Sequence, residues 1–420
     1  MIKKLLGIIL LFATILTAPA CSQKSVAPQQ QVKTGIDVLV EQDFEPLKGK
    51  RVGLITNATG VDKNLRSTVD LLNESENVEL VALYGPEHGV RGDISAGDKF
   101  DTYIDERTGI EVFSLYGKTR KPTNEMLENV DVLVYDIQDI GVRSYTFIST
   151  LGLAMEAAQE NGIEVMVLDR PNPLGGFKIE GNVVEDGYYS FISQYPTPYV
   201  YGLTPGEFAL LLNGEKMLTD GVQAELTVIG MEGWKRSMTF DKTGLSWVPT
   251  SPHIPHANSA YYYVASGILG ELGIFSEGVG YTTPFEVFAA EWIDENDLAE
   301  TMNGYGLEGV LFRPLVFKPY YGRDVGKTLR GVQIHFTDYT KTNLMELQLW
   351  FLQAHHELYP DKNAFEIGNP SRPAVFDKVI GTDKIREMFS KNFKVSDVQE
   401  YLHKDVESFR KTSQKYYLYN

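Results

Sequence analysis

Short apolar runs alternate with amphipathic stretches along the first half of the chain. Four runs of five or six mostly apolar residues each end in a polar turn; they are 51–55 (RVGLI), 78–83 (VELVAL), 130–135 (VDVLVY) and 164–168 (EVMVL). Between them the apolar positions take helical spacing, as in 144–161, which Gly162 closes as a C-cap glycine would. Continuously apolar strands separated by helices are typical of a parallel sheet covered on both faces. The pattern therefore predicts a Rossmann-like α/β domain.

The pattern changes after about residue 250. The segment 251–263 is rich in Pro, His, Asn and Tyr and is expected to form a long ordered loop. Beyond it, 332–336 (VQIHF) favours a strand and 343–358 a helix, within an irregular alternation. We therefore predict a Rossmann-like catalytic domain over 36–250 and a smaller α+β auxiliary domain over 251–420.

The N-terminus has the pattern of a secretory signal. Lys3 and Lys4 precede an apolar run over 5–16, and small residues follow. This run is too short to span a bilayer as a mature helix. We expect a signal peptide over 1–20 and an exported protein.

Cys21 directly follows the predicted signal and is the single cysteine of the chain. This position resembles a bacterial lipoprotein signal, in which the cysteine is lipidated, although Ala18 stands where leucine is usual. The alternative is a plain cleaved signal with an incidental cysteine. Residues 21–35 are rich in Gln, Ser, Ala and Pro, and predict a flexible tether. The expected location is periplasmic or cell-surface, with the lipid anchoring the protein to a membrane.

Composition and missing motifs narrow the function. The 420 residues are 43% hydrophobic and carry a net charge of −17, which fits a globular protein that repels nucleic acid. No G-x-G-x-x-G follows a strand, and there is no Walker loop and no G-x-S-x-G, so no cofactor is expected. His253 and His256 could bind a metal, but such a pair more often orders a proline-rich loop, and no metal is expected.

The most informative turn is 84–89 (YGPEHG), at the end of the second predicted strand. Open α/β sheets bind ligands beyond the carboxyl ends of their strands. A glutamate on a rigid, partly desolvated turn has a raised pKa, which suits a general acid. Glu87 is therefore the leading catalytic candidate, and His88 could bond a neighbour or carry a proton. The same turn is also explained by a Glu87 that only accepts backbone N–H bonds.

Other strand ends supply further candidates. Asp136 and Asp139 follow the third run and could give the second carboxylate that glycoside hydrolysis usually needs. Asp139 could instead pair with Arg143 or cap the next helix. Tyrosines 261–263 could line a glycan subsite, or simply pack. The remaining candidates for substrate binding are Asn57, Arg143, Tyr145, Asp169, Arg170, Asn172, Asn182 and Glu277.

Six long motifs carry a resemblance to a known family. They are GLITNATGVD (53–62), YGPEHGVRGD (84–93), YDIQDIGVRSYT (135–146), LDRPNPLGG (168–176), EGNVVE (180–185) and SEGVGYTTPFE (276–286). The chain resembles the exo-β-N-acetylmuramidase (NamZ-like) family, formerly a domain of unknown function, over about residues 36–420. The resemblance implies removal of terminal β-1,4-linked N-acetylmuramic acid from the non-reducing end of peptidoglycan fragments, as in cell-wall recycling. It also implies a cleft between a Rossmann-like and a C-terminal domain, with Glu87 as its key catalytic residue.

The resemblance leaves several points open. The second catalytic group could be Asp136, Asp139 or Glu277, or the acetamido group of the sugar, oriented by Asp136 or His88. A guanidinium would bind the lactyl carboxylate of the sugar, and Arg143 is the first candidate, with Arg170 second. Hydroxyl or amide contacts are expected from Asn57, Asn172 and Asn182. The rival functions are a surface glycan-binding lipoprotein that does not cleave its ligand, and a peptidoglycan amidase or esterase.

Overall fold

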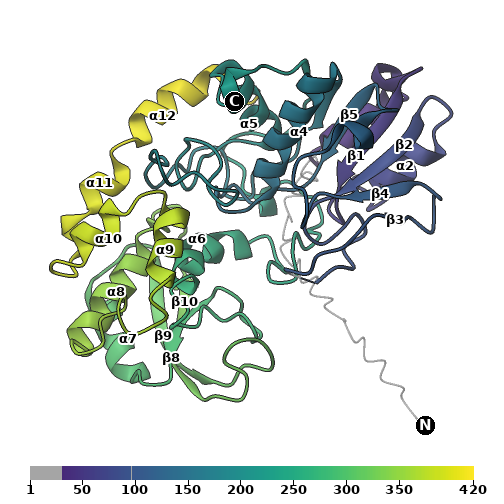
Figure 1. The fold of residues 1–420 in the computed structure, drawn as a ribbon. Helices are drawn as coiled ribbons and strands as arrows, with labels where there is room; N and C mark the ends of the chain where they lie inside the picture. Colours follow the sequence, from purple (N-terminus) through teal and green to yellow (C-terminus); the bar gives the residue numbers. More distant parts are fainter. Residues whose placement is uncertain (1–30, 96) are drawn as a thin grey trace, which may run out of the picture.

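The computed structural model describes residues 31–95 and 97–420 (Figure 1). The predicted signal peptide, Cys21 and residues 21–30 of the predicted tether lie outside the described residues. The chain first builds a large sheet with its helices, then a smaller sheet with a second group of helices.

The large sheet has seven strands in the order β3-β4-β2-β1-β5-β6-β7. All neighbouring pairs are parallel except β3 with β4, so the parallel strands follow the classical Rossmann order. The strands are β1 (Arg51–Thr56), β2 (Glu79–Gly85), β3 (Tyr103–Ile104), β4 (Glu111–Ser114), β5 (Val132–Asp136), β6 (Glu164–Leu168) and β7 (Leu226–Ile229). The predicted Rossmann-like sheet is confirmed. The sequence prediction lacked β3, β4 and β7, whose short runs do not stand out from their surroundings.

Helices cover both faces of this sheet, because alternate strand residues enter two different cores. Leu133 and Tyr135 pack with the helix α4 side, whereas Val132 and Val134 pack with α1 and α2. The helices of this part are α1 (Gly35–Glu41), α2 (Thr68–Glu74), α3 (Asn124–Leu127), α4 (Phe147–Asn161) and α5 (Pro205–Gly214). Helix α4 starts three residues later than predicted, because the Tyr145 N–H bonds the Val142 carbonyl in a turn. It ends at Gly162, which takes the left-handed conformation predicted for it.

The second part of the chain holds a three-stranded antiparallel sheet in the order β8-β10-β9. Its strands are β8 (Val287–Ala290), β9 (Val310–Phe317) and β10 (Leu329–Phe336). Its helices are α6 (Ser259–Gly270), α7 (Glu295–Gly304), α8 (Leu347–Leu358), α9 (Arg372–Ile380), α10 (Lys384–Phe389), α11 (Gln399–His403) and α12 (Val406–Ser413). The predicted α+β character of this part is confirmed. The loop predicted over 251–263 ends earlier, because tyrosines 261–263 lie on the apolar helix α6.

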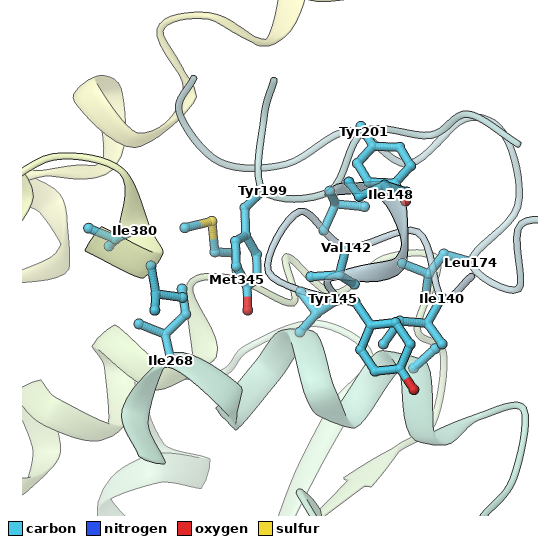
Figure 2. Packing of buried hydrophobic residues seen from close by; sticks show 14 of the residues in the cluster. Ile140, Val142, Tyr145, Ile148, Leu174, Tyr199, Tyr201, Ile268, Met345 and Ile380 are labelled. Atoms are coloured by element: carbon cyan, nitrogen blue, oxygen red, sulfur yellow. The ribbon is translucent and has the colours of Figure 1, made fainter. Parts of the chain in front are cut away.

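One hydrophobic core runs through both parts. Figure 2 shows Tyr199 and Val142 of the first part beside Ile268, Met345 and Ile380 of the second, and all five side chains are buried. The chain also returns to its first part at the C-terminus, where α12 lies near α5 (Figure 1). There the Tyr419 hydroxyl donates a 2.6 Å hydrogen bond to Asp169.

Candidate active site

A cavity of about 270 Å³ lies where the two parts of the chain meet. This volume is close to the lower end of the range for ligand pockets. The first part contributes the ends of β2 and β4, the turn before α4 and a later loop, and the second part contributes α6 and α9. The lining residues are Glu87, His88, Tyr116, Arg120, Ser144, Tyr145, Thr146, Phe147, Phe191, Ile192, Ser251, Tyr263, Gly267, Glu271 and Val379.

Glu87 stands on the turn that follows β2, and its side chain is half-buried in the cavity wall. The turn is sharp, because His88 and Gly89 both have positive φ angles of 77° and 70°. The Gly97 N–H donates a 3.0 Å hydrogen bond to Glu87 Oε1, which fixes the direction of the carboxyl group. One carboxyl oxygen is therefore held by the backbone while the group faces the cavity.

His88 is buried beside Glu87 and is held by one ring nitrogen. Its Nδ1 lies 3.1 Å from the Ile94 carbonyl oxygen. A carbonyl can only accept, so Nδ1 must carry the hydrogen, and Nε2 of the neutral ring is then an acceptor. This arrangement leaves His88 able to accept a hydrogen bond from a ligand.

Tyr116 and Arg120 follow β4 and complete the wall beside Glu87. Burial raises the pKa of Tyr116 to about 12, and the negative charge of Glu87 adds to that shift. The Arg120 guanidinium lies over the Phe191 ring, 4.1 Å from its centroid. A cation is thus presented at the cavity by an exposed side chain that stacks on an aromatic ring.

Tyr145 and Tyr263 meet edge to face at the floor of the cavity, with ring centroids 5.7 Å apart. The Tyr145 hydroxyl donates a 2.6 Å hydrogen bond to Thr250, and the Tyr263 hydroxyl lies 3.2 Å from Ser144 Oγ. Burial raises the pKa of Tyr263 to about 12, with further contributions from the charges of Glu271 and Glu87. Its hydroxyl therefore lies within the field of both carboxylates.

Glu271 brings a second carboxylate to the cavity from the end of helix α6, in the other half of the chain. Burial raises the pKa of Glu271, although the nearby cation of Arg372 opposes the shift. Arg372 Nη1 lies 3.6 Å from a Glu271 carboxyl oxygen. The sequence prediction missed Glu271, because a glutamate at a helix end in the second domain carries no motif.

The structure places Asp136 and Arg170 outside this cavity, in a buried ion pair. Arg170 Nη2 lies 2.8 Å from Asp136 Oδ2, and the Thr68 hydroxyl also donates to Asp136. Arg170 additionally bonds the Val61 carbonyl. The hydrogen bonds of both side chains are made within the protein, so neither residue is included among the proposed substrate contacts.

Arg143 also serves the fold. Its two terminal nitrogens donate to four backbone carbonyls, at Asn182, Thr197, Val379 and Ile380, over 2.6–3.0 Å. Complete burial lowers the pKa of this guanidinium to about 10. Val379 and Ile380 end helix α9, so Arg143 fastens the first part of the chain to the second and does not face the cavity.

Asp139 is buried in the turn between β5 and α4. It accepts hydrogen bonds from the Tyr201 hydroxyl and from the Gly141 N–H, the latter at 2.6 Å. Burial raises the pKa of Asp139 to about 6. It does not pair with Arg143, and it does not line the cavity.

The other predicted residues hold turns and helix ends. Asp169 accepts from Thr204 and Gly206 at the start of α5, and burial raises its pKa to about 6. The half-buried Glu277 faces the exposed Arg323, with a carboxyl oxygen 3.7 Å from Arg323 Nη2. The three asparagines bond backbone or neighbouring groups; they are Asn57, Asn172 and Asn182.

The open cavity lies at the carboxyl edge of the sheet, as the strand ends predicted, but it does not extend along all the strands that carry predicted site residues. The switch point of a Rossmann sheet lies between β1 and β5. Here Arg170 and Gln138 line a space of only about 20 Å³ at that point, which is room for about one water molecule. The open cavity lies instead toward β2 and β4, so it includes Glu87, His88 and Tyr145.

Among residues 31–95 and 97–420, no group of three or more His, Cys, Asp or Glu side chains is placed to hold a metal ion. His253 lies with its ring nearly parallel to that of Tyr321, with centroids 6.0 Å apart. Its Nε2 is 3.1 Å from the Tyr321 hydroxyl.

A Rossmann-like domain with an interdomain cavity that holds two carboxylates, tyrosines and a guanidinium has the features of a glycosidase that recognises an anionic sugar. The family comparison agrees with this class. The family model "Exo-beta-N-acetylmuramidase NamZ, N-terminal" matches residues 52–258, and the C-terminal model of the same family matches 261–419. The chain therefore belongs to the NamZ exo-β-N-acetylmuramidase family.

Individual relatives match along almost the whole chain. The peptidoglycan β-N-acetylmuramidase NamZ of Bacillus subtilis (strain 168) is 45% identical over 98% of this chain and 97% of its own length. A crystal structure of a DUF1343 family protein from Bacteroides fragilis NCTC 9343 is 57% identical, with a TM-score of 0.90, over 94% of this chain and 100% of that one. A second DUF1343 family protein from the same organism is 27% identical, with a TM-score of 0.75, over 93% and 99%.

Proposed function

We propose that this protein is an exo-acting glycosidase that releases terminal β-1,4-linked N-acetylmuramic acid from peptidoglycan fragments. The observation that carries the proposal is the position of Glu87, which the GPEHG turn presents in a sugar-sized cavity between the domains. Family membership supplies the substrate class, and the second carboxylate and the guanidinium in the same cavity fit it.

In the proposed reaction Glu87 acts as the acid and Glu271 as the base. Glu87 gives its proton to the glycosidic oxygen as the bond from that oxygen to the anomeric carbon breaks. Glu271 takes a proton from the water that attacks the anomeric carbon. The second sugar leaves as an alcohol, and N-acetylmuramic acid leaves with the hydroxyl from water.

Arg120 is the proposed receptor for the lactyl carboxylate of the substrate. The two arginines predicted from sequence are engaged elsewhere, Arg143 with carbonyls and Arg170 with Asp136. Arg120 lines the cavity and is already oriented by Phe191. A guanidinium can bind a carboxylate through two parallel hydrogen bonds, which would separate this sugar from plain N-acetylglucosamine.

The test uses the disaccharide N-acetylmuramyl-β-1,4-N-acetylglucosamine, which has no peptide amide and no ester. The protein should release free N-acetylmuramic acid, measured by mass spectrometry. Binding without release would favour a glycan-binding lipoprotein, and action only on peptide- or ester-bearing fragments would favour an amidase or esterase.

The role of Arg120 is tested with a matched pair of glycosides, one of N-acetylmuramic acid and one of N-acetylglucosamine. Arg120→Met should lower kcat/KM about ten- to hundredfold for the muramic acid glycoside. Any rate on the matching N-acetylglucosamine glycoside should stay at its wild-type value; an equal loss on both would exclude the carboxylate contact.

We further propose that the protein is exported and anchored to a membrane by a lipid on Cys21. The support is the sequence pattern around this residue. No helix among the described residues is long and apolar enough to cross a bilayer. Cys21→Ala should move the protein from the membrane fraction to the soluble exported fraction, as seen by immunoblotting, whereas the neighbouring Ser22→Ala should not. Membrane retention of Cys21→Ala would contradict lipidation.

A further inference from the structure

An exposed aromatic loop contacts His253, two residues from Ser251 of the cavity wall. The loop joins β9 to β10, and its Tyr320 and Tyr321 are 66% and 51% exposed. Two large aromatic rings on adjacent positions of one loop expose apolar surface that a ligand can cover. The proposed catalytic cavity does not use either ring.

The loop is held in place by the motif SEGVGYTTPFE, to which the proposed reaction gives no role. The Tyr320 N–H donates a 2.7 Å hydrogen bond to the Gly280 carbonyl. Gly280 has φ +95°, and a β-carbon there would lie 2.3 Å from the Tyr321 carbonyl oxygen. The Tyr281 ring lies between those of Phe317 and Tyr320 in tilted contacts, with centroids 4.8 and 5.4 Å apart. A backbone hydrogen bond and ring packing thus fix the position of the loop that carries the two exposed rings.

His253 links this loop to the cavity. Ser251 lines the cavity wall, and His253 follows two residues later with its ring against Tyr321. Burial lowers the pKa of His253, and the neighbouring His88 adds to the shift when it is charged. Tyr321 therefore contacts a side chain that lies two residues from the cavity wall.

We infer that Tyr320 and Tyr321 form a binding site for the second sugar of the substrate, the N-acetylglucosamine unit that leaves. This inference rests on the proposed function, because that function places a second ring just outside the cavity. The apolar face of a pyranose ring can lie against an aromatic ring, whereas the cavity itself has room for about one sugar. The loop would then hold the leaving sugar while Glu87 protonates the bond between the two rings.

Calorimetry in a Glu87→Gln background tests the site without turnover. The disaccharide should bind about three- to tenfold more weakly to a Tyr320→Ala variant, and more weakly again when Tyr321→Ala is added. Free N-acetylmuramic acid, which reaches only the cavity, should bind all these variants equally. Phe177→Ala is the matched control, because Phe177 is 57% exposed and does not line the cavity.

The outcomes separate the two proposals. Equal disaccharide affinity with and without the tyrosines would overturn the inference. So would an equal loss for the monosaccharide, because that result would mean a distorted cavity. If the wild-type protein binds the disaccharide through these tyrosines but releases no sugar, the proposed function fails and the binding site stands.

Discussion

Replacement of Glu87 by glutamine should abolish sugar release while the protein stays folded. Loss of a general acid typically costs two to four powers of ten in rate, so kcat/KM on the disaccharide should fall about a thousandfold. The glutamine amide oxygen can still accept the Gly97 N–H, so the turn keeps its hydrogen bond. The rate is measured as N-acetylmuramic acid released per unit time, and folding by the thermal unfolding midpoint.

The control for this variant is Glu106→Gln, which changes an exposed glutamate in the same way. It should keep both the rate and the unfolding midpoint. A Glu87→Gln protein with wild-type turnover would make Glu87 a structural residue of the turn and would end the present assignment of the site.

Replacement of Glu271 by glutamine should lower kcat about a hundredfold and alter the pH profile. A base must be ionised to act, and burial raises the pKa of Glu271. In the wild type the rate should therefore fall as pH drops through a value above the ordinary glutamate range. The variant should lose this acidic limb, which is read from kcat measured between acidic and neutral pH.

Arg372→Met offers a second test of the direction in which the Glu271 pKa shifts. The Arg372 cation opposes the rise of the Glu271 pKa, so its removal should raise that pKa further and move the acidic limb to higher pH. A Glu271→Gln enzyme with unchanged kcat and an unchanged limb would exclude this base. The acetamido group of the sugar would then be the candidate that remains for the attack.

The sequence predicts the fold well, because a parallel sheet is encoded by local signals. Apolar runs of five or six residues and the polar turns after them located β1, β2, β5 and β6, and Gly162 marked the end of α4. The missed strands of the large sheet, β3, β4 and β7, are short, and their pairing partners decide their conformation more than their own residues do. Pairing of this kind is a tertiary effect. In the second part β8 and the eight-residue β9 were also missed.

The candidate site was predictable only in part. Glu87, His88 and Tyr145 line the cavity, as their place at strand ends suggested. A polar residue at a strand end can already be hydrogen-bonded within the protein, and the sequence does not show this. The ion pair of Asp136 with Arg170 and the hydrogen bonds of Arg143 to backbone carbonyls are of this kind. Residues such as Arg120 and Glu271 come from a loop and from the far domain, where only folding brings them near Glu87.

The hydrophobic core that passes without a break from one domain to the other also bears on how substrates are chosen. Domains that meet through thin polar seams tend to swing, whereas a broad apolar junction resists such movement. The sugar-binding cavity is thus already formed in the free protein. We therefore expect selection at the binding step: the terminal sugar of a glycan chain fits the existing cavity, whereas an internal sugar, linked on both sides, does not.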